Sequence, residues 1–163
     1  MRTHKTLLER FFKQYSDGFN LGLQGKPNIA ETVNSFASVF LASNPNGVQC
    51  KKNDESFRGV IPMAYEFYKS IGITRMEIVE MQITGLNQFH SMCSATWRAW
   101  YTQKNGKEKT LDFEIVYLVR FEAGQPKIFA YITPDEETIL KEKGLVPNGE
   151  TAKPVQASAS RNY

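Results

Sequence analysis

The last third of the chain most constrains its fold, because it consists of long extended segments joined by short turns. Residues 89–103 and 110–122 are two such segments, and Asn105-Gly106 stands between them. Both residues of an Asn-Gly pair tolerate positive φ angles, which favours a tight hairpin. Strands of this length after several amphipathic helices predict a curved sheet that wraps around a helical layer and encloses a pocket.

Three helices are predicted before the long strands. Residues 6–23 have apolar side chains at helical spacing, and Gly25-Lys26-Pro27 ends that pattern. The second helix begins after Asn28, and its apolar face extends to Leu41. The third is predicted to follow residues 56–59 and to end at Gly72, with Pro62 in its first turn, where a missing N–H is tolerated.

From Ile73 onward the apolar period becomes two, which is typical of strands. The alternation changes parity near Val79, and this slip predicts a β-bulge that bends the sheet. Residues 44–47 predict a turn before a short strand over 48–52. The strand over residues 110–122 places one apolar row on a single face: Phe113, Ile115, Tyr117, Val119 and Phe121.

A four-residue turn at 123–126 is predicted next, which would place Glu122 opposite Lys127 as an ion pair. In that register the other face of the sheet has an apolar centre with a charged rim. Such a face is typical of a protein interface, so we expect a homodimer through it. Its central residues are Val116, Leu118, Phe129 and Tyr131.

The 163 residues are enough for one domain, which we place at 1–147. Residues 148–163 lack apolar periodicity and are predicted to be a disordered tail. The net charge of +3 comes from scattered charges of both signs, so nucleic acid is not an expected partner. Two cysteines, no signal peptide and no apolar stretch of membrane-spanning length lead us to expect a cytoplasmic protein with no membrane partner.

Three groups of residues carry a resemblance to a known family: Phe57-Arg58-Gly59, Phe121…Gly124…Lys127-Ile128, and Asp135…Leu140…Gly144-Leu145. With the order of elements, they make the chain similar to the nuclear-transport-factor-like superfamily, in particular its SnoaL-like and ketosteroid-isomerase-like branches. The resemblance implies an α+β cone, in which three N-terminal helices pack on the concave face of a strongly curved mixed or antiparallel sheet. It also implies a deep pocket and dimers formed through the sheet.

The family's catalytic residues transfer only in part. Where ketosteroid isomerases have a general base, this chain has Lys51-Lys52-Asn53, and Asp54 is the nearest acid. The position of their oxyanion donor falls on Tyr117, whose hydroxyl could donate the same hydrogen bond. Asp54 can equally cap a helix, and Tyr117 can equally be a core tyrosine. The histidines His4 and His90 match no motif of the SnoaL-like enzymes.

Aromatic side chains are the expected ligand contacts. Trp97 and Trp100 face opposite sides of one strand. A two-residue loop at Asn105-Gly106 would place Trp100 on the face of Tyr117, and a loop one residue longer would place Trp97 there. The residues predicted to line the pocket are Tyr15, Phe19, Phe67, Trp97, Trp100 and Tyr117.

Three functions stay open from the sequence. The first is an apolar cone pocket that binds a hydrophobic small molecule. The second is an isomerase, cyclase or dehydratase that uses Tyr117 as a donor and Asp54 or Glu114 as a base. The third is a dimeric accessory module whose own side chains fill the cone, which a cavity below about 150 Å³ would favour. No metal site and no cofactor are expected.

Overall fold

The computed structural model describes residues 2–146. Its described part contains four helices and six strands. In chain order these are α1 (Arg2–Leu23), α2 (Ile29–Asn34), β1 (Phe36–Asn44), β2 (Gly47–Lys52), α3 (Glu55–Ser70), β3 (Ile73–Gly85), β4 (His90–Thr102), β5 (Glu108–Glu122), β6 (Gln125–Ile132) and α4 (Glu136–Glu142). None of these helices has the length and apolar character needed to cross a lipid bilayer.

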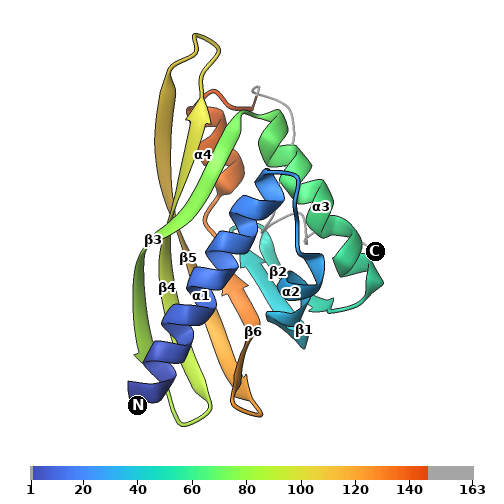
Figure 1. The fold of residues 1–163 in the computed structure, drawn as a ribbon, viewed down its shortest axis with the longest axis vertical. Coiled ribbons are helices and arrows are strands. Elements are labelled where there is room, and N and C mark those ends of the chain that lie inside the picture. The colour runs from blue at the N-terminus through green and yellow to red at the C-terminus, as the bar shows by residue number, and fades with distance from the viewer. Residues whose placement is uncertain (1, 147–163) are drawn as a thin grey trace.

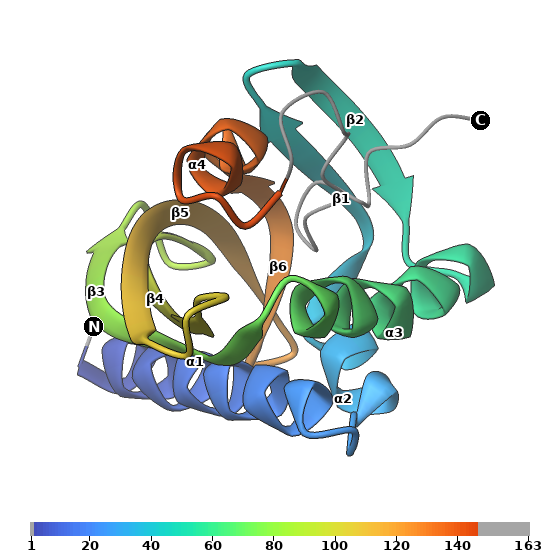
Figure 2. The same ribbon diagram turned by 90° about the horizontal axis from the view of Figure 1, so that it is seen from above.

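The six strands form one mixed sheet in the order β2-β1-β6-β5-β4-β3. The pair β1–β6 is parallel and the other neighbours are antiparallel. Helix α1 crosses the sheet diagonally (Figure 1), and the strands β3 to β6 curve over it when seen from above (Figure 2). The sheet does not close, because β2 and β3 end it. The expected fold class, three N-terminal helices on a curved mixed sheet, is confirmed.

The core lies between α1, α3 and the concave face of the sheet. On β4 every second residue from Cys93 to Tyr101 is buried, and on β5 the same holds for Ile115 to Phe121. Helix α1 contributes Phe12 and Phe19 to the same cluster. Fully burying one such aromatic side chain contributes about 1.5–3 kcal/mol, so this alternation fixes which face of the sheet meets the helices.

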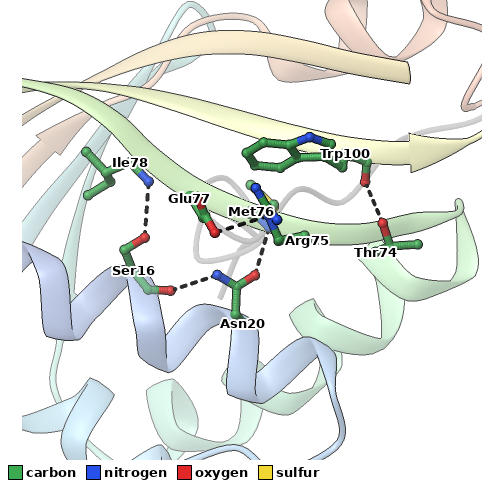
Figure 3. Close-up of polar contacts among 8 residues, drawn as sticks. All are labelled: Ser16, Asn20, Thr74, Arg75, Met76, Glu77, Ile78 and Trp100. Carbon is green, nitrogen blue, oxygen red and sulfur yellow. Dashed lines mark hydrogen bonds and ion pairs between the residues drawn. The ribbon is translucent and has the colours of Figure 1, made fainter. Parts of the chain in front are cut away.

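Helix α1 also covers the free edge of β3 (Figure 3). The Oδ1 atom of Asn20 accepts a hydrogen bond of 2.9 Å from the Met76 N–H, and Oγ of Ser16 accepts one of 3.1 Å from the Ile78 N–H. Both N–H groups belong to the outer edge of the sheet, which is otherwise a template for pairing with another chain. Immediately beyond, the pairing with β4 shifts between Ile78 and Glu80, which confirms the predicted bulge at Val79.

The second helix is shorter than its apolar pattern predicted. It ends at Asn34, and residues 36–44 form β1 instead. Phe36, Phe40 and Leu41 are spaced as on a helix, but Phe36 and Leu41 pair with Ile128 and Ala130 of β6. Pairing with a buried strand therefore overrides the local pattern, as tertiary contacts commonly do.

The expectation for Pro62 was also wrong, because α3 begins earlier than predicted. Asp54 caps this helix, accepting hydrogen bonds from the N–H groups of Ser56 at 3.0 Å and Phe57 at 3.4 Å. Pro62 then lies inside the helix and not in its first turn. A proline there has no N–H for the carbonyl one turn earlier, so that hydrogen bond is lost.

The last hairpin differs from the predicted four-residue turn. Glu122 pairs with Gln125, so the turn consists of Ala123 and Gly124, whose φ angles are 47° and 77°. Two positive φ angles are typical of the tight turns that suit strand twist. As a result Lys127 lies opposite Arg120 and not opposite Glu122.

A second irregularity changes the predicted outer face. The pairing of β5 with β6 shifts between Leu118 and Val119, and beyond that point Tyr131 lies opposite Tyr117. Tyr131 is therefore buried in the core with only 3% of its surface exposed, so its place in the predicted interface was wrong. The predicted domain end at residue 147 and the predicted tail over 148–163 lie outside the described residues.

Candidate functional site

A pocket lies where α1, α2 and α3 meet the sheet, and we call it the aromatic pocket. Its free volume is about 30 Å³, room for one or two water molecules. This is far below the roughly 300–1,000 Å³ of typical ligand pockets. The residues that line it are Tyr15, Phe19, Thr32, Phe36, Phe57, Val60, Ile61, Ala64, Tyr65 and Tyr131.

Tyr65 of α3 forms the wall that α1 supports. Its ring lies against Gly22, where a Cβ atom would come within 2.6 Å of three ring atoms. The ring of Phe19 meets it edge-on, with 5.1 Å between ring centroids. Burial raises the pKa of Tyr65, and a side-chain hydrogen bond with Thr32 of α2 opposes this rise. Burial thus keeps the Tyr65 phenol neutral, and the contacts with Gly22, Phe19 and Thr32 hold it in one position.

Tyr117 lies behind the aromatic pocket, in the core. Its hydroxyl oxygen accepts a hydrogen bond of 3.0 Å from the Trp97 indole N–H. The rings of Phe12 and Tyr15 pack against it at 5.0 and 6.0 Å between centroids. Burial holds the pKa of Tyr117 well above its ordinary value, so this phenol stays protonated.

The two tryptophans occupy opposite faces of β4. Thr102 pairs with Glu108, and the Gln103 N–H donates to the Lys107 carbonyl at 2.8 Å, so the loop is the longer of the two alternatives. Trp97 consequently faces the core with 1% of its surface exposed. Trp100 faces outward, where the Arg75 guanidinium lies 3.7 Å from its ring centroid. Of the two, Trp97 is the side chain within the cone.

The proposed catalytic residues do not converge. Asp54 is exposed, and the hydrogen bonds from Ser56 and Phe57 hold its pKa below its ordinary value. Glu114 lies on the outer face of the sheet, where it accepts a hydrogen bond of 2.7 Å from the Ser94 hydroxyl. Tyr117 is inside the cone. Phe67, a predicted ligand contact, is half-buried on α3 with its ring 5.6 Å from that of Tyr68.

Glu136 is a buried acid that was not among the predicted site residues. Only 6% of its surface is exposed, its Oε2 accepts a hydrogen bond of 3.0 Å from the Tyr68 hydroxyl, and its Oε1 has no hydrogen-bond partner among the described residues. Burial raises its pKa to about 7, against the opposing effect of the Tyr68 hydrogen bond. The available signal was helical spacing, because Glu136 shares the buried face of α4 with Leu140, one turn later.

A second, smaller cavity adjoins this acid, and we call it the inner cavity. Its free volume is about 10 Å³, the lower limit for one water molecule. Within residues 2–146, acidic, histidine and cysteine side chains nowhere gather in threes as a metal site would require. The inner cavity is lined by Tyr68, Ile73, Met76, Ala99, Leu111, Phe113, Glu136, Ile139 and Leu140.

The curved sheet, the helical layer and the interior pocket define a protein of the NTF2-like cone class. The model of one such family, described as NTF2-like protein (DUF6841), matches residues 5–136. The chain belongs to this family. A search of curated protein sequences found no match.

Solved structures share the fold at low sequence identity. A protein of unknown function from Mycobacterium tuberculosis is 10% identical, with a TM-score of 0.59 over 96% of this chain and 83% of that one. An NTF2-like protein of unknown function from Shewanella oneidensis is 13% identical, with a TM-score of 0.56 over 78% and 98%. A ketosteroid isomerase-like protein from Erwinia carotovora atroseptica is 13% identical, with a TM-score of 0.55 over 79% and 93%. These similarities show the fold alone.

Proposed function

We propose that this protein binds a small apolar molecule, about the size of one or two fused rings, in the aromatic pocket. The main support for this proposal is the set of residues that line the pocket. Three phenol groups, those of Tyr15, Tyr65 and Tyr131, stand in a wall that is otherwise almost entirely apolar. A mostly apolar concave site with a few polar groups is the usual form of a small-molecule site.

The polar groups of the interior favour a binding site over plain packing. Tyr68, Tyr117 and Glu136 are buried as well, so hydroxyl and carboxyl groups recur throughout the cone. A buried polar group needs a partner to offset a desolvation penalty of about 1–3 kcal/mol, and here Tyr68 pairs with Glu136 and Tyr117 with Trp97. A cone filled only for stability can be packed with aliphatic side chains, which need no such partners.

The aromatic pocket has to widen before it accepts such a molecule, because its free volume is about 30 Å³. Its outer wall consists of Thr32 on the short helix α2 and of Phe57 and Val60 on the first two turns of α3. All three side chains are half-buried and reach the surface. We infer that the ligand enters between α2 and α3 and displaces these side chains.

Ligand-observed NMR tests this proposal by measuring whether the protein binds toluene, p-cresol and indane. Val60→Trp fills the entrance and should abolish binding, while Met63→Trp adds the same side chain at a position 65% exposed on the same helix and should leave binding intact. Absence of binding by the unmodified protein, or equal binding by both variants, would show that this pocket is not a ligand site.

The small volume favours a second candidate, a non-catalytic dimeric module whose cone is filled. An apolar patch on the convex side of the sheet supports it, and Met92 and Ile132 there are 37% and 48% exposed. Patches with exposed apolar centres are typical of interfaces. The patch consists of Leu41, Met92, Val116, Leu118, Phe129 and Ile132.

Light scattering at micromolar concentration tests this dimer. Leu118→Glu introduces a charge at the centre of the patch and should produce a monomer. Leu21→Glu places the same charge on α1, where the leucine is 41% exposed, and should leave the dimer intact. An unmodified protein that is already monomeric would rule the module out.

We further infer a cytoplasmic location. Cys50 is exposed and Cys93 is buried, and both are free thiols. Free thiols are the usual state in the reducing cytoplasm. Fractionation of cells that express the protein tests this location, and recovery outside the cytosolic fraction would contradict it.

A further inference from the structure

Helix α4 does not need the carboxyl group of Glu136. Its neighbour Asp135 caps the helix by accepting a hydrogen bond of 3.0 Å from the Thr138 N–H. Its other neighbour Glu137 pairs with Lys141 at 2.6 Å, one turn later. The usual reasons for acidic residues at the start of a helix are thus met by residues other than Glu136. Its burial calls for a separate explanation.

The geometry of the carboxyl group determines where its proton lies. The Tyr68 hydroxyl donates to Oε2 at 3.0 Å, so a neutral Glu136 has its proton on Oε1. Oε1 is buried, and no group in the described part of the chain forms a hydrogen bond with it. Neutral Glu136 therefore presents an unused O–H donor inside the protein. Buried polar groups of this kind are rare in folded proteins, and a functional role is one of the few reasons for which they are kept.

The surroundings favour this neutral form. The inner cavity contributes apolar side chains from β3, β4 and β5 around Glu136. The titratable groups that face it are the phenols of Tyr68 on α3, Tyr117 on β5 and Tyr131 on β6. Burial, and not a neighbouring anion, is the main cause of its raised pKa of about 7. Near neutral pH a large fraction of the protein thus keeps the donor.

Glu136 lies one layer of side chains behind the aromatic pocket. Phe19 lines that pocket, and its ring is 5.8 Å from the ring of Tyr68, the partner of Glu136. Tyr131 lines the pocket too. Burial is the main cause of its raised pKa, with smaller contributions from Tyr15 and Glu136, so Glu136 lies within electrostatic range of it. The rings of Phe19 and Tyr68 thus stand between the aromatic pocket and the inner cavity, and a molecule in the pocket reaches Glu136 only when these rings move.

We propose that Glu136, oriented by Tyr68, donates a hydrogen bond from Oε1 to an uncharged acceptor oxygen of the bound molecule. This inference rests on the proposed function and narrows its ligand class to small ring compounds that bear a carbonyl group. A neutral carboxyl donor in an apolar site suits such an acceptor, since the competing hydrogen bond to water is excluded there. Ionisation of Glu136 replaces the donor with an anion, which disfavours the same carbonyl.

The experiment compares indane with indanone, which share one shape and differ by a carbonyl group. Their dissociation constants are measured by NMR titration about one pH unit below and one above the Glu136 pKa of about 7. The unmodified protein should prefer indanone by about three- to tenfold at the lower pH, the effect of one additional hydrogen bond. That preference should disappear at the higher pH.

Two variants isolate the carboxyl group. Glu136→Gln keeps an N–H donor but cannot ionise, so it should retain the preference at both pH values; Glu136→Met removes the donor and should lose it. Equal binding of indane and indanone by the unmodified protein at both pH values overturns this inference and leaves the aromatic pocket standing as a ligand site. If neither compound binds, the proposed function and the inference both fall. If the Met variant does not fold, the pH profiles of the unmodified and Gln proteins still show whether the Glu136 carboxyl group determines the preference for indanone.

Discussion

The indole N–H of Trp97 and the hydroxyl of Tyr117 form a hydrogen bond of 3.0 Å inside the core, between adjacent strands β4 and β5. Trp97 is 1% exposed and Tyr117 is fully buried. Tyr117 is the residue that the family resemblance most favours as catalytic. Its hydroxyl already accepts a hydrogen bond from a buried donor, the Trp97 indole N–H. Its position fits a structural role, which can be separated from ligand binding by one substitution.

Tyr117→Phe should lower the free energy of unfolding by about 1–3 kcal/mol, because it removes the acceptor of a buried indole N–H. Urea unfolding measures this loss. Trp97→Phe and the double variant complete a thermodynamic cycle, in which the two losses should not add. If Tyr117→Phe instead keeps full stability and weakens the binding of p-cresol, Tyr117 is a ligand contact and the structural role is wrong.

The raised pKa of Glu136 is expected to make the protein less stable as the pH rises through the acidic range. Its pKa in the folded protein is about 7, above the ordinary 4.5, so the unfolded chain releases this proton first as the pH rises. Its contribution to the free energy of unfolding therefore falls between about pH 4.5 and 7, by about 3 kcal/mol in total, and is constant above that range.

Urea unfolding of the unmodified protein and of Glu136→Gln across this pH range measures the effect, and the Gln variant should lack the decline. Asp54, Asp112 and Asp135 have pKa values below the ordinary 3.8, so the stability that they add is lost only at lower pH. Identical pH profiles for the two proteins would mean that the Glu136 carboxyl is solvated.

The parts of the fold that local patterns govern were predictable from the sequence. Three sequence patterns each allow one structure, and that structure is found in each case. They are the parity change of apolar residues at Val79, the alternation of buried and outward side chains in β5, and the apolar stripe of α1. The register of the last hairpin was not predictable, because Ala123 adopts a positive φ angle that its residue type disfavours. That turn and the nearby bulge determine that Tyr131 faces inward.

The candidate site was predictable only in part, for a related reason. Tyr15 and Phe19 belong to the apolar stripe of α1, and both side chains line the aromatic pocket. Glu136 lies within a run of three acidic residues in which local rules explain all three equally well. Only the docking of α4 against Tyr68 distinguishes the buried one, and that contact joins positions 68 residues apart.

Asn20→Ala should expose the edge of β3. The Met76 N–H would lose its acceptor, which should lower the free energy of unfolding by about 1–2 kcal/mol and accelerate hydrogen exchange at that amide. An uncovered edge strand also favours association between chains, so the variant should aggregate more readily. Gln14→Ala removes an exposed amide side chain from the same helix and serves as the control. Unchanged exchange at Met76 in the Asn20 variant would show that α1 does not protect this edge.

Gly22→Ala and Gly18→Ala form a matched pair on α1. Alanine at either position favours a helix by about 0.5–1 kcal/mol, and at Gly18 nothing lies within 4 Å of the added Cβ, so that variant should gain this amount. At Gly22 the Cβ would lie within 2.6 Å of three ring atoms of Tyr65, and displacing that ring should lower the free energy of unfolding by about 1–3 kcal/mol. Because Tyr65 lines the aromatic pocket, Gly22→Ala should also weaken the binding of p-cresol, whereas Gly18→Ala should not. Urea unfolding and NMR titration measure both effects, and equal stability of the two variants would mean that Tyr65 moves aside freely and does not form a fixed wall.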